Sequence, residues 1–340
     1  MNPVILVWGQ FLGVAMVILG AGYYLCLYGD AIADKTNLGR SWVGAILLGV
    51  VTSLPELAAG VSAITVTDAP DLVLGELLGS CVFNLLMLVM LDVMYRSQTM
   101  YAQVDKSQAL TSAFGSLLIG FTGVAILTSQ GLLPFNIGHI GWYSFAIPLF
   151  YFFAMKELLQ FESDQPTASE PEVKLETEKK IEDMPLSTAV FRYAIAALVV
   201  VGAGIYLPVV AERISTVMGW NEAFVGTLFI ALTTSLPEAA VTVSAISIGA
   251  IDLAFGNVVG SNLFNILIIP ICDAIYTKGP ILESVSLGHA VTALSGMVMS
   301  GLAIIGILAP PRRKVLGIMS WISVSLVLMY ALNTMVLFKS

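Results

Sequence analysis

Charged side chains are scarce in this sequence of 340 residues: they make up 11% of it, whereas apolar residues make up 57%. Soluble domains carry about 25% charged residues, so the composition argues against a soluble domain. The net charge of −8 gives no support for a nucleic-acid partner. Cysteine and histidine are also rare, with three and two copies, and they lack metal-ligand spacing. We therefore expect no zinc or copper site, no cofactor, and cysteines that only fill apolar space.

A cleavable signal peptide is lacking as well, because the first residues show neither a basic segment nor a small-residue cleavage site. What the chain has in abundance is apolar runs of bilayer length, about 20 residues each. We predict an all-α integral membrane protein with ten transmembrane helices. The predicted spans are 4–28, 40–67, 71–95, 107–129, 139–160, 187–211, 221–248, 252–276, 284–308 and 315–338.

A polar segment, residues 161–185, separates the fifth span from the sixth and holds eight acidic residues against three lysines. Such a segment predicts a solvated linker between two five-helix halves, 1–160 and 186–340. Lys and Arg number twelve in loops on the linker's side and three on the other. This bias predicts a cytoplasmic linker and outward-facing termini in the cell (inner) membrane. The sequence indicates the lipid bilayer as its surroundings and no obligate protein partner.

The two halves share sequence. From Thr52 to Ile64 and from Thr234 to Ile246, ten of thirteen aligned residues are identical, including TSLPE in both. The similarity continues as LGELLGSCVFN (74–84) against FGNVVGSNLFN (255–265). Five spans per half give these repeats, at about 40–95 and 221–276, opposite orientations in the membrane. Inverted repeats are typical of secondary transporters, whose site lies near the midplane where the repeats meet.

Each repeat also places a proline and a glutamate inside an apolar span. Pro55 cannot donate a hydrogen bond to the carbonyl of Val51, and Pro237 cannot donate to that of Thr233. A carboxylate in hydrocarbon is costly and marks a functional site. We therefore predict that both spans break at this motif and that a cation satisfies the released carbonyls.

Side chains that carry oxygen accompany both glutamates. Thr and Ser stand four and three residues before each glutamate, and Ser and Asn stand four apart in the following span, so each set shares a helix face. The predicted ion-binding residues are Glu56, Glu238, Thr52, Ser53, Thr234, Ser235, Ser80, Asn84, Ser261 and Asn265. Hard oxygen donors suit Ca²⁺, with about six to eight ligands, and also Na⁺. Two carboxylates balance a divalent charge, and without it they would take up protons or monovalent ions.

These motifs resemble those of the cation/calcium antiporter superfamily, whose repeats carry G-T-S-x-P-E/D and G-N-x-x-G-S-N-x-x-N/D. Here they read VTSLPE and GELLGSCVFN, then TTSLPE and GNVVGSNLFN, most like prokaryotic sodium/calcium exchangers. The resemblance implies that Glu56 and Glu238 bind Ca²⁺ and take part in binding Na⁺, with the hydroxyl and amide residues completing overlapping sites. It also implies that the first and sixth spans slide across the other eight to alternate access.

The sequence departs from the family motifs at several positions. Val51 and Thr233 replace the leading glycine, and Cys81 replaces an asparagine. Asn265 stands where many relatives have aspartate, which argues against a potassium requirement. Glu76 replaces another asparagine.

Three further acids lie within spans or at their ends. Glu76 is one helical turn from Ser80, so it is expected to line an access path or to act as a proton-titrating ligand. The alternative for Glu76 is a rim carboxylate in contact with water. Asp92 and Asp273 occupy matching positions near span ends, and we expect them to be interface residues and not ligands.

We expect an antiporter that exchanges Ca²⁺ for Na⁺ by alternating access, because the same oxygens cannot hold both ions at once. A Ca²⁺/H⁺ antiporter, or one for another divalent cation and H⁺, is the alternative that Glu76 keeps open. A cation channel with an acidic pore is a more distant alternative, disfavoured by the inverted repeats. No nucleophile–base set indicates an enzyme.

Overall fold

The computed structural model describes residues 3–36, 38–95, 99–129, 135–163, 184–219, 231–315 and 317–337. Within these ranges the chain is almost entirely helical, and its only strands form a small hairpin, β1 (Asn136–Ile137) with β2 (Ile140–Gly141). Most of the predicted linker and the first part of the predicted seventh span lie outside the described residues.

The helices of the first half follow the predicted spans. They are α1 (Pro3–Thr36), α2 (Arg40–Trp42), the π-helix η1 (Val43–Leu48), α3 (Gly49–Thr52), α4 (Leu54–Thr65), α5 (Pro70–Met94), the 3₁₀ turn η2 (Met100–Ala102), α6 (Ser107–Ser129) and α7 (Tyr143–Ser163). Helix α1 runs about two turns past the predicted end of its span. Its last turns are polar, and Asp30 pairs there with Arg40 at 2.5 Å, so the helix outlasts the apolar stretch.

The second half repeats this order. It comprises α9 (Leu186–Met218), α11 (Ala231–Thr234), α12 (Leu236–Ser247), α13 (Ile251–Ile275), the 3₁₀ turn η4 (Ile281–Glu283), α14 (Gly288–Leu308) and α15 (Trp321–Leu337). Helix α15 begins later than the predicted residue 315, because Val315 and Met319 pair with each other in a turn.

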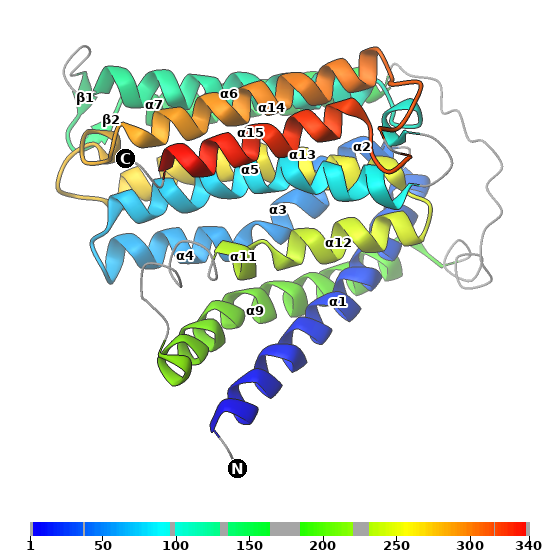
Figure 1. Cartoon of the computed structure of the whole chain (residues 1–340), viewed down its shortest axis with the longest axis horizontal. Helices are drawn as coiled ribbons and strands as arrows, with labels where there is room; N and C mark the ends of the chain where they lie inside the picture. The colour runs from blue at the N-terminus through cyan, green and yellow to red at the C-terminus, as the bar shows by residue number, and fades with distance from the viewer. Residues whose placement is uncertain are drawn as a thin grey trace.

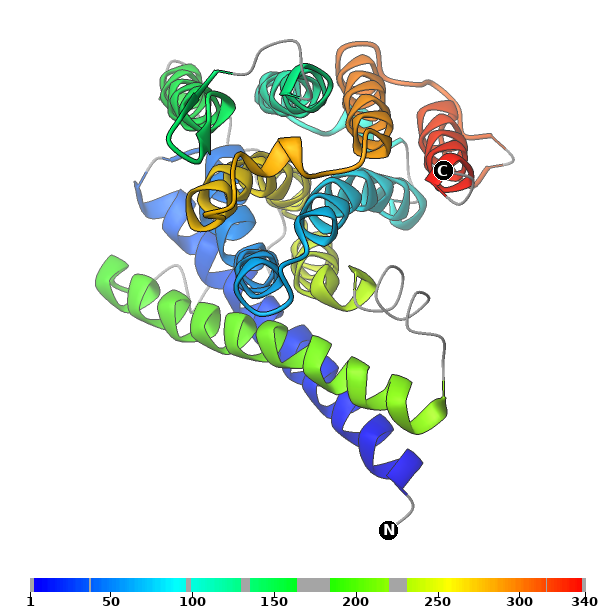
Figure 2. The ribbon, with the colours of Figure 1, turned by 90° about the vertical axis from the view of Figure 1, so that its left-hand side faces the viewer.

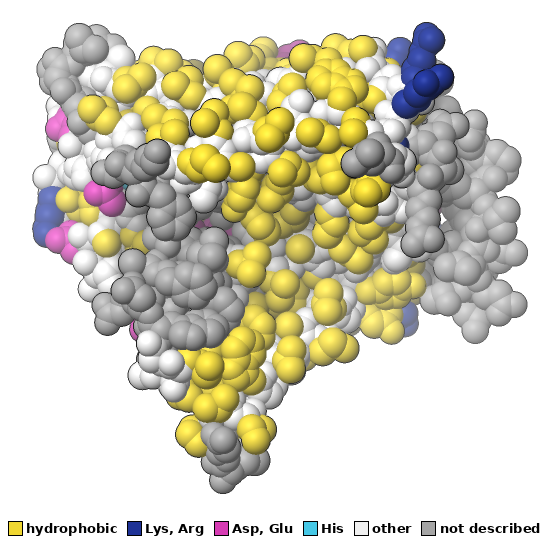
Figure 3. Space-filling model, viewed as in Figure 1, with side chains coloured by type: hydrophobic (Ala, Val, Ile, Leu, Met, Phe, Trp, Pro, Cys, Tyr) yellow, Lys and Arg dark blue, Asp and Glu magenta, His cyan; other side chains and the backbone are white. Residues whose placement is uncertain are grey.

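The outer surface matches a bilayer environment. Among the described residues, seven helical segments are long and apolar enough to cross a membrane. The other predicted spans correspond to α7, to the α11–α12 pair and to α15. A broad apolar band covers the face seen in Figure 3, and charged side chains gather at its two ends. The prediction of an all-α integral membrane protein is confirmed.

The helices form layers (Figures 1 and 2). Helices α6, α7, α14 and α15 line one side, and α5 and α13 pass through the middle beside the broken helices α3–α4 and α11–α12. Helices α1 and α9 lie on the opposite side, where they cross the bundle obliquely and pack against each other. The predicted sliding pair is therefore a separate layer that covers the broken helices.

Two buried aspartates, at equivalent positions of the two repeats, connect the halves through hydrogen bonds. Asp92, near the end of α5, accepts a hydrogen bond from Ser323 Oγ of α15 at 2.7 Å. Asp273, near the end of α13, accepts one from Ser144 Oγ of α7 at 2.6 Å. The other donors are the N–H groups of Met100 and Ser320 for Asp92, and those of Gly141 and Ile281 with the Tyr143 hydroxyl for Asp273. Both aspartates thus have the interface role expected of them.

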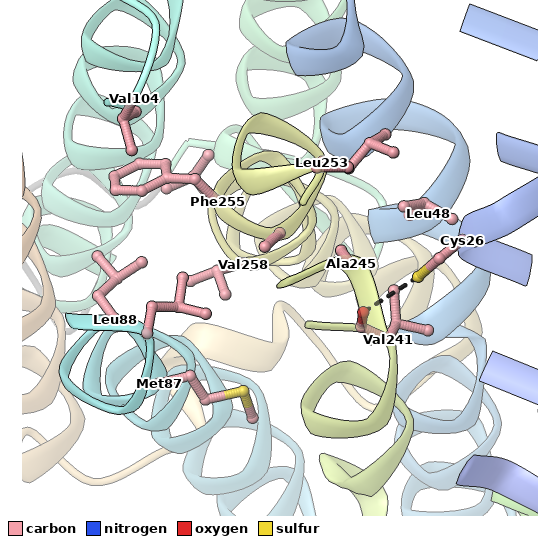
Figure 4. Close-up of a cluster of buried hydrophobic side chains, with 14 of the residues drawn as sticks. Cys26, Leu48, Met87, Leu88, Val104, Val241, Ala245, Leu253, Phe255 and Val258 are labelled. Carbon is pink, nitrogen blue, oxygen red and sulfur yellow. Dashed lines mark hydrogen bonds between the residues drawn. The ribbon is translucent and has the colours of Figure 1, made fainter. Parts of the chain in front are cut away.

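The apolar core joins the layer formed by α1 and α9 to the middle layer. Cys26 of α1 donates its thiol hydrogen to the carbonyl of Val241 in α12, 3.1 Å away, beside Leu48 and Ala245 (Figure 4). All three cysteines are buried and unbonded to one another. Their packing agrees with the expected role as apolar filler.

Candidate ion-binding site

The two glutamates predicted to bind the ion directly follow breaks in their helices. Ser53 separates α3 from α4 with φ −91° and ψ 7°, and Ser235 separates α11 from α12 with φ −82° and ψ 6°. The proline two residues after each serine cannot donate to the preceding turn, which explains why both breaks occur in TSLPE. Thr234, the last residue of α11, is buried beside its break. The predicted broken helices are confirmed.

The breaks bring side chains from the two repeats together. Ser53 Oγ of the first repeat donates to Glu238 Oε1 of the second at 3.0 Å. The hydroxyls of Ser80 and Ser235 lie 3.5 Å apart. Glu56 and Glu238 are both fully buried. The carboxylate of Glu238 therefore lies against the helix break of the first repeat, which directly precedes Glu56.

A close backbone approach supports this region on one side. The hydroxyls of Thr52 and Ser261 are 3.2 Å apart, and Ser261 Oγ donates to the carbonyl of Gly49 at 3.3 Å. A Cβ added at Gly49 would lie 2.7 Å from the backbone nitrogen of Ser261. Glycine is required at this contact because any side chain would push α3 away from α13.

Asparagines complete the site, and two of them were not among the predicted ligands. Asn84 donates to Asn262 Oδ1 at 3.1 Å, and Asn262 donates to the carbonyl of Cys81 at 3.1 Å. Asn257 accepts a hydrogen bond from Thr52 at 3.2 Å. The repeated motif GNVVGSNLFN already contained this information, because both missed residues are its inner asparagines.

Several buried polar atoms of the predicted ion-binding residues have no hydrogen-bond partner among the described residues. They are both carboxylate oxygens of Glu56, Oε2 of Glu238, Oδ1 of Asn84, and both amide atoms of Asn265. Leaving such atoms unpaired in a dry interior is expensive. A cation would satisfy the oxygens, so the donor set fits a hard ion.

The described residues contain no group of three or more His, Cys, Asp and Glu side chains that could hold a metal ion. A cation at this position would therefore depend on two carboxylates together with hydroxyl, amide and carbonyl oxygens. Such all-oxygen coordination is typical of Ca²⁺.

Glu76 lies apart from the central group, one turn before Ser80 in α5. Its side chain is partly exposed, yet its Oε1 is buried without a hydrogen-bond partner in the described part of the chain. The access or proton-titrating role of Glu76 and the alternative of a rim carboxylate in contact with water both stay predictions.

Comparison with known proteins gives a consistent result. A protein-family model described as "Sodium/calcium exchanger protein" matches residues 6–155 and 187–339, which is most of both halves. The inner membrane protein YrbG of Escherichia coli is 27% identical over 243 residues, covering 70% of each chain. The sodium/calcium exchanger MaX1 of Methanosarcina acetivorans is 24% identical over 283 residues, covering 76% of this chain and 79% of MaX1.

The fold also matches solved structures. A structure of the sodium-calcium exchanger NCX_Mj, soaked with Na⁺ and Sr²⁺, superposes with a TM-score of 0.72 at 19% identity. The match covers 97% of this chain and 98% of that one. At this identity the likeness concerns the arrangement of the helices.

Proposed function

The chain belongs to the sodium/calcium exchanger protein family, and we propose that this membrane antiporter exchanges Ca²⁺ for Na⁺ by alternating access. The observation that carries the proposal is the pair of fully buried glutamates, Glu56 and Glu238, on mirrored broken helices. Three of their four carboxylate oxygens lack a hydrogen-bond partner among the described residues. Two negative charges in hydrocarbon call for two positive charges, which one Ca²⁺ supplies.

The remaining ligands come from neutral oxygens close to the glutamates. Ser53 already contacts Glu238 across the repeats, and the hydroxyls of Thr52 and Ser261 adjoin the carbonyl of Gly49. The full ligand set that we propose is Glu56, Glu238, Thr52, Ser53, Thr234, Ser235, Ser80, Asn84, Ser261 and Asn265. Not all of these need bind one ion, because Na⁺ positions share the same oxygens.

Coupling follows from this shared ligand set. Ca²⁺ and Na⁺ compete for the two carboxylates, so loading one ion requires release of the other. An antiporter also needs two access states that bind its ions in turn. We propose that α1 and α9 move together across the broken helices, since they form a separate layer in direct contact with each other.

The direction of insertion follows from the positively charged loops. We propose a cytoplasmic linker at 161–185 and both termini outside, because twelve of fifteen Lys and Arg residues belong to the linker's side. In that orientation the N-terminal end of α5 faces outward and that of α13 faces the cytoplasm. The inward Na⁺ gradient of a cell would drive Ca²⁺ outward in either orientation.

The proposal is tested with purified full-length protein in sealed vesicles. Ca²⁺ uptake is followed while gradients of Na⁺, K⁺ and pH are imposed one at a time. We expect uptake only when Na⁺ is more concentrated inside. Uptake driven by a pH gradient alone would favour the Ca²⁺/H⁺ alternative, and uptake that needs no counter-ion would favour a channel.

The proposed ligands are tested in the same vesicles. Glu56→Gln and Glu238→Gln each keep the shape of the side chain but remove one charge, so either variant should abolish Ca²⁺ uptake. Glu283→Gln is the matched control, because Glu283 is exposed in η4, away from the breaks. Normal transport by either site variant would contradict the assignment.

A further inference from the structure

Helices α5 and α13 are equivalent helices of the two inverted repeats, and their shared motif differs in polar residues at two positions, Glu76 against Asn257 and Cys81 against Asn262. Both span 25 residues, and both end before a tyrosine, Tyr95 or Tyr276, in extended conformation. Asn257 is the second residue of the motif GNVVGSNLFN, and Glu76 takes its place in GELLGSCVFN. The two repeats therefore place an amide and a carboxyl group at equivalent points relative to the ion site.

In the second repeat, Asn257 forms hydrogen bonds through all the polar atoms of its side chain. Asn257 is fully buried. Its amide donates to the carbonyl of Glu238 at 3.3 Å and to Thr242 Oγ1 at 3.1 Å, and its oxygen accepts from Thr52 at 3.2 Å. Every polar atom of the side chain is satisfied by the protein, so no ligand is needed there.

The first repeat lacks the side-chain groups that form these hydrogen bonds in the second repeat. Gly60 stands where the second repeat has Thr242, so the hydroxyl group is missing. A Cβ at Gly60 would lie 3.2 Å from the sulfur of Cys272, so the thiol of Cys272 occupies the neighbouring volume. Glu76 cannot donate as Asn257 does while it is ionised, and its Oε1 is buried without a partner among the described residues.

The neighbouring charged groups do not compensate the carboxylate of Glu76. Within the described residues, no Lys, Arg or His forms a salt bridge with Glu76. A Cβ added at Gly75 would lie 3.4 Å from Cε1 of His289, but Nε2 of His289 is 3.0 Å from Asp71 Oδ1. A partly desolvated carboxylate in such surroundings is neutralised either by a proton or by a cation from solution.

We infer that Glu76 forms an additional sodium position, one helical turn closer than Ser80 to the N-terminal end of α5. One turn corresponds to about 6 Å along the helix, so this position adjoins the central site without sharing its ligands. In the proposed orientation it lies on the outer side, and its partly exposed side chain connects it to solution. Asn257, at the mirrored cytoplasmic position, provides no equivalent site.

The inference deepens the proposed function and rests on it. Glu56, Glu238 and Glu76 together carry three negative charges, and one Ca²⁺ balances two. Sodium ions can balance all three, so Glu76 should add one Na⁺ to the number that binds cooperatively. The residue would then set the ratio of Na⁺ to Ca²⁺ and hence how strongly the membrane potential acts on exchange.

The test measures the Na⁺ dependence of Ca²⁺ exchange in vesicles at each of several fixed pH values, for the unmodified protein, Glu76→Gln and Glu283→Gln. The Hill coefficient for Na⁺ cannot exceed the number of sites, and we expect it to fall by about one in Glu76→Gln. Glu283→Gln should match the unmodified protein. Ca²⁺ uptake itself should persist in Glu76→Gln, because the central glutamates remain.

The outcomes separate this inference from the proposed function. If the unmodified protein shows no Na⁺-driven uptake, the proposed function is wrong. If it does, but Glu76→Gln keeps the full Na⁺ cooperativity, the sodium position alone is wrong. A change confined to the pH dependence would also overturn it, since the ligand would then be a proton.

A second measurement needs no variant and so covers the case in which Glu76→Gln fails to fold. Crystals of the unmodified protein grown with and without Na⁺ can be compared in a difference density map. The inference predicts a peak beside Glu76 that is present only with Na⁺, in addition to any peak at the central site. No such peak beside Glu76 at saturating Na⁺ would overturn it.

Discussion

At Gly204, α9 packs closely against both broken helices. A Cβ added there would lie 2.6 Å from Cγ of Pro55 and 3.2 Å from Cγ of Pro237. Proline rings cannot rotate away, so Gly204→Ala must push α9 off the TSLPE motifs. Gly202, two residues earlier and on the exposed face of α9, has no atom within 4 Å of an added Cβ among the described residues, which makes Gly202→Ala the matched control.

The expected magnitude follows from this overlap. Overpacking of this kind costs about 1–3 kcal/mol, and the same free energy changes an equilibrium between two access states by about 5–150-fold. A transport cycle that visits both states slows when one becomes rare. We therefore expect Gly204→Ala to slow exchange by up to about the same factor, if α9 leaves this position during the cycle.

The assay compares initial rates of Na⁺-driven Ca²⁺ uptake in vesicles, with equal amounts of folded protein confirmed by thermal unfolding in detergent. Gly202→Ala should behave as the unmodified protein does. If Gly204→Ala also exchanges at the unmodified rate, then the contact of α9 with the two prolines does not limit the cycle, and the proposed movement of the outer layer loses its support.

Three other substitutions test the surrounding structure. Asp273→Asn removes an acceptor from a carboxylate that receives four hydrogen bonds, so thermal unfolding should show a loss of about 3 kcal/mol or more; unchanged stability would contradict the mirrored interface role. Gly260→Ala would place a Cβ 2.0 Å from the carbonyl oxygen of Ala45 and should prevent correct folding, which size-exclusion chromatography would show as aggregation. Gly301→Ala is the control and should fold normally, because no described atom lies within 4 Å of a Cβ added there. Ser53→Ala removes the donor to Glu238 and should weaken Ca²⁺ binding by about 1.5–3 kcal/mol in calorimetric titration. Ser325→Ala, which removes an exposed hydroxyl of α15, should leave Ca²⁺ binding unchanged.

Much of the fold was predictable from the sequence because two strong signals coincide. Apolar runs fixed the spans, and the repeated TSLPE motif located both breaks at Ser53 and Ser235. Helix ends were less accessible to prediction. Helix α1 continues through polar residues to Thr36, where Asp30 pairs with Arg40 of α2, so hydropathy alone does not locate its end.

The site was predictable as a set of residues but not as a network. Spacing alone suggested that Ser53 belongs with Glu56, whereas its hydroxyl actually donates to Glu238 of the other repeat. Contacts between repeats depend on how α3 and α13 approach each other at Gly49, which no local pattern encodes. The motif GNVVGSNLFN contains Asn257 and Asn262, but their hydrogen-bond partners lie on other helices, so the motif alone does not show what they contact.

The central claim is that Glu56 and Glu238, one from each inverted repeat, hold a single divalent cation between them. Anomalous scattering from crystals soaked in Sr²⁺, with Na⁺ excluded, tests it most directly. The account predicts one strong peak contacted by both carboxylates and lost when Na⁺ is added in excess. A peak bound by only one glutamate, or located away from both, would contradict it.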